Sequence, residues 1–163
     1  MKYTLSIEIA LPRERVVQLL ADPAHLPMWL RGLVVHEPLS GAHGQVGTAS
    51  RVVVRAGQKE MEATETITRL EPADLHGIPR DAVVRFEREI VADGMWNAAR
   101  ERLTEAGPVT TLWVSENEFR FSGWPMRLAA PLLRGAFRKQ SRQHMQDFKA
   151  FAEHGTDVRE AEG

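Results

Sequence analysis

The sequence predicts an α+β domain in which a seven-stranded, curved antiparallel sheet wraps around one long C-terminal helix. Two observations support this class. Seven segments have the apolar patterning of strands, and turn residues separate the last six of them. Two short helical segments follow the first strand, and a long amphipathic segment follows the last. The length of 163 residues fits one domain, predicted at residues 1–154, with a flexible polar tail over residues 155–163.

The N-terminal elements are a strand and two short helices. Apolar and polar residues alternate over residues 3–9, which is typical of a half-buried strand. Pro12 suits the first turn of a helix, predicted over residues 13–21, and Asp22-Pro23 ends it. A second short helix is expected over residues 24–29.

Six further strands follow as a meander, because turn residues such as Gly57, Asp93-Gly94 and Gly107-Pro108 separate apolar segments of strand length. A seven-stranded sheet with one apolar face must cover that face. The six predicted strands are residues 33–39, 48–56, 58–70, 82–92, 95–105 and 109–121.

The C-terminal helix is the only element large enough to cover the sheet. Helical spacing puts five apolar residues on one face and gathers basic residues on another. Pro131 is expected to split or kink an earlier apolar turn from the main helix. A curved sheet around this helix is expected to leave a ligand cavity. The apolar face comprises Leu133, Phe137, Phe148, Phe151 and Ala152.

Composition excludes several functions. The chain has no cysteine, which excludes disulfides, thiolate metal sites and a cysteine nucleophile. Twenty-one basic and 22 acidic residues give a net charge of −1, so no global field attracts nucleic acid. The six histidines lack metal-ligand spacing, and the glycines at 41, 44 and 47 do not lead into a helix as a phosphate loop would. We therefore expect no metal and no cofactor.

The N-terminus contains no secretory signal, and no apolar segment approaches the roughly 18 residues of a membrane span. A cytoplasmic location is therefore expected. Residues 124–133 are apolar with interspersed arginine. They are interpreted as a lid, a homodimer contact, a shallow site of transient membrane contact, or packed first turns of the helix.

Strand parity places several polar side chains on the mostly apolar concave face. Two carboxylates and one arginine there form either a structural ion-pair cluster or a site for a polar ligand head. Two carboxylates in an apolar pocket also raise at least one pKa, which suits a general acid or base. The polar set comprises Glu65, Arg88, Asn97, Glu101 and Asn117, and Met61, Ile67 and Ile90 are predicted to point the same way.

Ring side chains and the C-terminal helix supply the remaining predicted ligand contacts. His144 lies in the middle of the apolar helix face, where it is either a proton donor and acceptor or a core histidine with one hydrogen bond. These further ligand-binding candidates are Phe86, Trp113, Phe119, Phe137, Gln140 and His144.

Several local stretches of the sequence match a known protein family. They are Pro12 to Pro23 with Leu26-Pro27 and Trp29, Gly44 to Gly47, Glu65 to Ile67, Gly94 to Asn97, and Glu118 to Gly123 with Gly135 to Phe137. With the order of elements, these stretches resemble the SRPBCC superfamily of START-like, helix-grip proteins, in particular a bacterial branch similar to polyketide cyclases and dehydrases. The resemblance covers residues 3 to 153 and implies the helix-grip fold. It does not specify an activity, because the fold hosts carriers, receptors, cyclases and chaperone activators.

Three functions remain open. The first is binding or carriage of a small hydrophobic or amphipathic molecule such as a lipid, polyketide or aromatic metabolite. The second is a cyclase-like enzyme in which Glu65, Glu101 or His144 abstracts a proton next to a carbonyl. In that enzyme Arg88 or Asn117 would stabilise the enolate oxygen. The third is an interaction module similar to chaperone activators, with an apolar contact surface.

Overall fold

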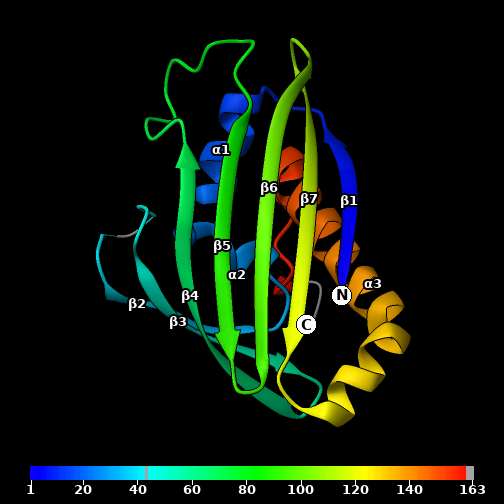
Figure 1. The fold of residues 1–163 in the computed structure, drawn as a ribbon. Coiled ribbons are helices and arrows are strands. Elements are labelled where there is room, and N and C mark those ends of the chain that lie inside the picture. The colour runs from blue at the N-terminus through cyan, green and yellow to red at the C-terminus, as the bar shows by residue number, and fades with distance from the viewer. Residues whose placement is uncertain (43, 161–163) are drawn as a thin grey trace.

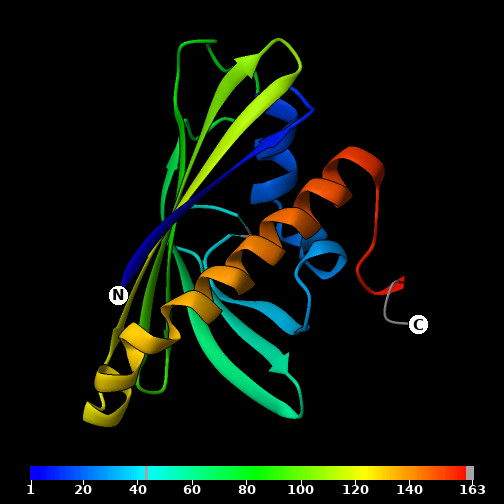
Figure 2. The ribbon, with the colours of Figure 1, turned by 90° about the vertical axis from the view of Figure 1, so that its right-hand side faces the viewer.

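The computed structural model describes residues 1–42 and 44–160. It contains one seven-stranded antiparallel sheet in the order β1-β7-β6-β5-β4-β3-β2, and α3 crosses its concave face (Figures 1 and 2). This is the predicted helix-grip architecture. The elements are β1 (Lys2–Ile9), α1 (Arg13–Ala21), η1 (Pro23–His25), α2 (Leu26–Trp29), β2 (Leu33–Ser40), β3 (Ala49–Ala56), β4 (Lys59–Glu71), β5 (Val84–Ala92), β6 (Met95–Gly107), β7 (Thr110–Phe121) and α3 (Trp124–His154).

The loop between β4 and β5 is fixed by a side chain of α1. Arg13 is 2% exposed, and its guanidinium donates hydrogen bonds to the carbonyl oxygens of Pro79 (2.8 Å), Arg80 (3.3 Å) and Ala82. The carbonyl of Ala82 therefore bonds to α1, and β5 begins at Val84, two residues later than predicted. Sequence reasoning did not single out Arg13.

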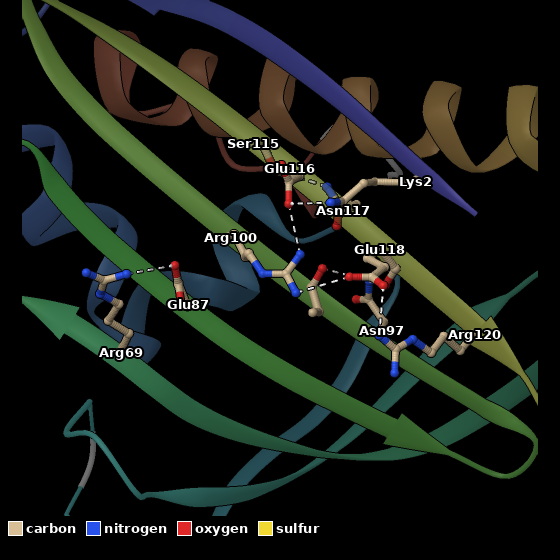
Figure 3. Close-up of polar contacts among 11 residues, drawn as sticks. Lys2, Arg69, Glu87, Asn97, Arg100, Ser115, Glu116, Asn117, Glu118 and Arg120 are labelled. Carbon is tan, nitrogen blue, oxygen red and sulfur yellow. Dashed lines mark hydrogen bonds and ion pairs between the residues drawn. The ribbon is translucent and has the colours of Figure 1, made fainter.

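The face of the sheet opposite α3 carries ion pairs (Figure 3). Arg100 lies between two glutamates of β7, with Nη1 2.8 Å from Glu116 Oε1 and Nη2 3.1 Å from Glu118 Oε1. Arg120 also contacts Glu118, at 3.1 Å, and Lys2 of β1 contacts Glu116 at 3.5 Å. These side chains are partly accessible to solvent, so this face is a solvated surface. Ion pairs of this kind contribute little to stability.

Aromatic rings fill much of the space between the sheet and α3. The Phe148 ring of α3 packs edge-on against Trp29 at 5.2 Å and against Trp113 at 5.3 Å between ring centroids. Nearer the start of α3, Phe137 packs against Phe119 of β7 at 4.9 Å. Trp113, Phe119 and Phe137 thus pack against neighbouring rings where the sequence analysis places a cavity wall.

The structure corrects the predicted course of α3. One continuous helix runs from Trp124 to His154 with Pro131 inside it, so the predicted split is wrong, although the ribbon changes direction within its yellow first third (Figure 1). Leu133 is exposed and does not belong to the buried face. Met61 is also exposed, because it lies near the start of β4, in the β3–β4 hairpin that extends past the helix (Figure 2).

The C-terminal segment packs against the core. Val158 is buried, and its backbone N–H donates a hydrogen bond to the carbonyl of Met28 at 2.9 Å. Residues 155–160 therefore differ from a free polar tail, because one apolar side chain anchors them to α2. Residues 161–163 of that predicted tail lie outside the described residues, as does His43, one of the histidines considered as a metal ligand.

Two further properties concern the described residues as a set. None of their helices is long and apolar enough to cross a membrane. No three of their histidine, aspartate or glutamate side chains gather in a way that could hold a metal ion.

Candidate functional site

Arg88, Glu65 and Glu101 meet on the concave face of the sheet. In the strand register Arg88 of β5 lies opposite Ile67 of β4 and Ala99 of β6. The two glutamates lie two residues from these partners, at diagonal positions on the same face. Arg88 Nη1 is 3.5 Å from Glu65 Oε2, and Nη2 is 3.1 Å from Glu101 Oε1. Both carboxylates therefore lie on one face of the sheet, as the alternation of side chains along the strands predicts.

Neighbouring side chains complete this cluster. Trp113 Nε1 donates to Glu101 Oε2 at 2.6 Å, and His36 Nε2 lies 3.2 Å from Glu65 Oε1. Burial raises the pKa of Glu101, against the opposing effects of Arg88 and the hydrogen bond from Trp113. Burial also acts to raise the pKa of Glu65, but the hydrogen bond to His36 and the charge of Arg88 outweigh it and leave that pKa lowered.

The cluster is closed to an organic ligand. Each carboxylate has a cationic partner, and the enclosed space beside Glu65, Phe86 and Arg88 has a volume of about 20 Å³. Such a space holds about one water molecule. The Arg88 guanidinium also lies over the Phe86 ring, 5.1 Å from its centroid. These residues therefore form an internal ion-pair network of the sheet. Of the two interpretations given above, a structural ion-pair cluster or a site for a polar ligand head, this geometry favours the first.

The two asparagines are likewise bonded within the protein. Asn97 Nδ2 donates to the carbonyl of Glu118 at 3.0 Å, a contact drawn in Figure 3. Asn117 Nδ2 donates to Ser115 Oγ at 3.1 Å. Both side chains are buried: the Asn97 amide joins β6 to β7, the Asn117 amide bonds within β7, and neither side chain lines the small enclosed space or the larger pocket between α3 and the β2–β3 strands.

A pocket of about 710 Å³ opens at the edge of the interior, between α3, the segment that follows α2, and the strands β2 and β3. Among the described residues that line it none is acidic, and its wall combines apolar, basic and uncharged polar side chains. Its lining consists of Pro27, Leu30, Arg31, Gly32, Leu33, Val34, Arg55, Ala56, Gly57, Ala136, Lys139, Gln140, Gln143, His144, Val158 and Arg159.

The predicted ligand residues are divided between different places. Gln140 and His144 line the large pocket, whereas Glu65, Phe86 and Arg88 line the small enclosed space. The structure does not bring them into one cavity, because the two spaces have no described lining residue in common. The remaining six belong to neither lining: Asn97, Glu101, Trp113, Asn117, Phe119 and Phe137.

His144 is the predicted catalytic candidate that lies in the pocket wall. Its Nδ1 is buried and has no hydrogen-bond partner among the described residues. Burial lowers the pKa of His144; the charge of Asp147 opposes this shift, and that of Arg31 adds to it. The neutral imidazole is therefore the form that this site favours at neutral pH.

Arg31 and Asp147 form a contact that sequence reasoning missed. The guanidinium binds the carboxylate in a bidentate manner, with Nε–Oδ2 and Nη2–Oδ1 distances both 3.1 Å. Gln143 Nε2 donates to the same carboxylate at 3.0 Å. The pair joins the segment between α2 and β2 to α3 and so holds one side of the pocket. Asp147 is the first acidic residue of α3, and this position is the one feature of the sequence that could have indicated its role in the contact.

The pocket's other basic side chains have their carboxylate partners outside its lining. Arg55 Nη2 is 2.6 Å from Glu60 Oε1, and Arg159 Nη2 is 2.6 Å from Asp157 Oδ2. Lys139 adds an ammonium group from α3. The wall therefore carries guanidinium groups that are paired with carboxylates, together with the ammonium group of Lys139.

Comparison with known proteins identifies one family and many solved structures with the same fold. A family model described as polyketide cyclase/dehydrase and lipid transport matches residues 1–153. A search of curated proteins found no match. Among solved structures, a Thermus thermophilus protein superposes with a TM-score of 0.73 at 16% identity, covering 93% of this chain and 97% of that one.

Two further structures belong to enzymes. The Zhui aromatase/cyclase from a Streptomyces species has a TM-score of 0.71 at 17% identity, covering 94% of this chain and 93% of that chain. Norcoclaurine synthase from Thalictrum flavum, in complex with dopamine and hydroxybenzaldehyde, has a TM-score of 0.65 at 16% identity, with coverage of 94% and 87%. At these identities the likeness is one of fold.

Proposed function

Because the chain belongs to the polyketide cyclase/dehydrase and lipid transport family, we propose that it binds and carries a small amphipathic molecule in the pocket between α3 and the β2–β3 strands. The observation that carries this proposal is the lining of that pocket, where apolar walls occur with basic side chains and no described acidic one. A ligand with an apolar body and an anionic head fits this lining.

In the proposed binding, the apolar and the basic side chains of the pocket have different roles. Leu30, Leu33 and Val34 offer apolar surface, whose removal from water drives binding. Basic groups such as Lys139 orient a carboxylate or phosphate through charge-assisted hydrogen bonds. Carriage also agrees with the closed state of the Arg88 cluster, since its carboxylates are paired and are not free bases.

The test has two stages. Native mass spectrometry of gently purified protein is expected to show a co-purified acidic amphiphile. Decanoate is then expected to raise the melting temperature more than decanol does at the same concentration, because only decanoate carries the anionic head. Equal effects of the two compounds, or no effect of either, would contradict the proposed ligand class.

A bulky substitution locates the binding site. Ala136→Trp, at the exposed mouth of the pocket, is expected to weaken decanoate binding by about tenfold or more, because the indole occupies ligand space. Ala106→Trp is the matched control, since Ala106 is exposed in β6 and does not line the pocket. Titration calorimetry measures both. Unchanged affinity of the Ala136→Trp variant would place the ligand elsewhere.

A second candidate function, proton transfer to or from a bound carbonyl compound, draws support from His144. A neutral imidazole in the wall of a ligand pocket has the state that a general base requires. Incubation of the protein with a ketone in deuterated water, followed by NMR, would show deuterium next to the carbonyl if His144 acts in this way. His144→Gln is expected to abolish that exchange while ligand binding persists, whereas carriage alone gives no exchange in either protein.

A further inference from the structure

The first turns of α3 expose a row of large apolar side chains. Trp124, Leu128 and Leu132 follow one another at intervals of four residues, so they share one face of the helix. Their exposed fractions are 72%, 69% and 87%. The opposite face is packed, with Ala130 buried against the domain. The row is therefore an apolar surface on an otherwise anchored helix, and single exposed leucines elsewhere do not compare with it.

The charged side chains along this part of α3 have one sign. Residues 124–146 contain five basic side chains and no acidic one. Two of the five donate hydrogen bonds to main-chain carbonyls of β1: Arg134 Nε to Lys2 and Arg138 Nη1 to Thr4, each at 3.1 Å. These bonds hold the arginines in place, and among the described residues no carboxylate forms an ion pair with either of them. The five residues are Arg127, Arg134, Arg138, Lys139 and Arg142.

The row also lies at an end of the molecule. In Figure 2 the yellow first turns of α3 extend beyond the body of the domain at the end where the β3–β4 hairpin projects. A flat surface that approaches this end therefore meets the first turns of α3 and the β3–β4 hairpin.

We infer that this face of α3 docks on the surface of an anionic lipid bilayer. Tryptophan is favoured at the interface between headgroups and hydrocarbon, and the two leucines would enter the acyl region. Arginine and lysine beside the row would lie at the level of the lipid phosphates, where each basic residue adds to the attraction. A bilayer offers both components, because the negative charge of its headgroups lies above its apolar layer.

A second copy of the chain fits this surface less well. A two-fold contact through the row would bring the same basic residues of both copies together, and like charges in an interface oppose association. No carboxylate within residues 124–146 could offset them. The charge pattern thus selects a polyanionic, partly apolar partner.

Docking here would also place the pocket near the bilayer. Ala136 and Lys139 line the pocket and follow the apolar row by one to two helical turns. The inference goes beyond the proposed ligand binding and does not depend on it, because vesicle binding is measured without any pocket ligand.

Vesicle binding tests the inference. We expect the full chain to sediment with vesicles of equal parts phosphatidylcholine and phosphatidylglycerol, and not with pure phosphatidylcholine, and we expect added salt to weaken the binding. Trp124 should shift its emission to shorter wavelength on binding, because Trp29 and Trp113 are already buried and Trp96 is covered by the Arg120 guanidinium. The shift should disappear in Trp124→Phe, which retains the apolar side chain.

Charged substitutions identify the docking face. Leu128→Glu with Leu132→Glu is expected to weaken binding to the anionic vesicles by about tenfold or more. The matched control is Val109→Glu, since Val109 is also exposed but lies in the β6–β7 turn at the other end of the sheet (Figure 1). Circular dichroism and the melting temperature check that the double variant is folded, without use of any pocket ligand.

Three results would overturn the inference. The first is failure of the unsubstituted protein to bind anionic vesicles. The second is equal binding by the double Leu→Glu variant and by the unsubstituted protein. The third is a dimer in light scattering that the same double substitution converts to a monomer, which would assign the surface to a second copy.

Discussion

Glu101 illustrates how a buried charge is retained at the residue scale. Only 4% of its side chain is exposed, yet Trp113 donates to one carboxylate oxygen and Arg88 to the other. A buried carboxylate is unfavourable unless such partners replace water. Arg88 compensates Glu65 as well, so one guanidinium keeps two carboxylates ionisable inside the sheet. The network is therefore sensitive to the loss of that single cation.

Arg88→Leu is expected to lower the free energy of unfolding by about 3–5 kcal/mol, because it leaves two buried carboxylates without their cation. Urea denaturation at neutral pH measures the loss. Arg51→Leu is the comparison, since Arg51 pairs with Glu37 and Glu62 on the exposed surface and should change stability by about 1 kcal/mol or less. If both variants lose equally little, the cluster is not compensated as the geometry indicates.

At the scale of elements, the local sequence pattern predicts which face of a strand a side chain lies on, but it does not predict how distant elements pack against each other. Strand parity is sufficient to put Glu65, Arg88 and Glu101 on one face, because alternation is a geometric property of a strand. The pocket was not predictable in the same way. Its wall depends on how β2 and β3 lie against α3, and the Arg31–Asp147 pair that joins them spans 116 positions of the sequence. No local periodicity links residues that far apart.

The same distinction explains the errors along α3. Helical spacing puts Leu133 on the face of Phe137, but burial also requires an element opposite that part of the helix. Pro131 has no amide hydrogen to donate, yet the helix continues through it because packing on either side outweighs one lost hydrogen bond. The buried Arg13 was missed since an arginine in the first turn of an amphipathic helix is ordinarily exposed.

Arg13 makes the loop between β4 and β5 dependent on α1. Arg13→Met is expected to lower the free energy of unfolding by at least about 3 kcal/mol, because several carbonyl oxygens lose a charged donor. Limited proteolysis should then cleave residues 72–83 faster than in the unsubstituted protein. Arg15→Met, at an exposed position of the same helix, is the control and should change neither measurement. A stable, protease-resistant Arg13→Met variant would show that the loop is held by other contacts.

The whole molecule is held together by the contact of one helix with one sheet, and a titratable side chain lies in that contact. His144 is partly buried on α3, and its environment favours the neutral ring. Burial lowers its pKa in the folded protein below the value of about 6.5 in the unfolded chain. Between the two pKa values the unfolded chain binds more protons, so the free energy of unfolding must fall as the pH falls.

Acidification should therefore weaken the domain through His144. The loss of stability is expected to begin as the pH falls through about 6.5 and to be complete below the folded-state pKa, where both states are protonated. His144→Gln removes this titration, so its stability should depend less on pH between 7 and 5 than that of the unsubstituted protein. The lowered pKa of Glu65 also reduces stability in acid, but only near the unfolded carboxylate pKa of about 4.3 and below. Urea denaturation at each pH separates the two ranges, and parallel curves for the two proteins above pH 5 would refute the role of His144.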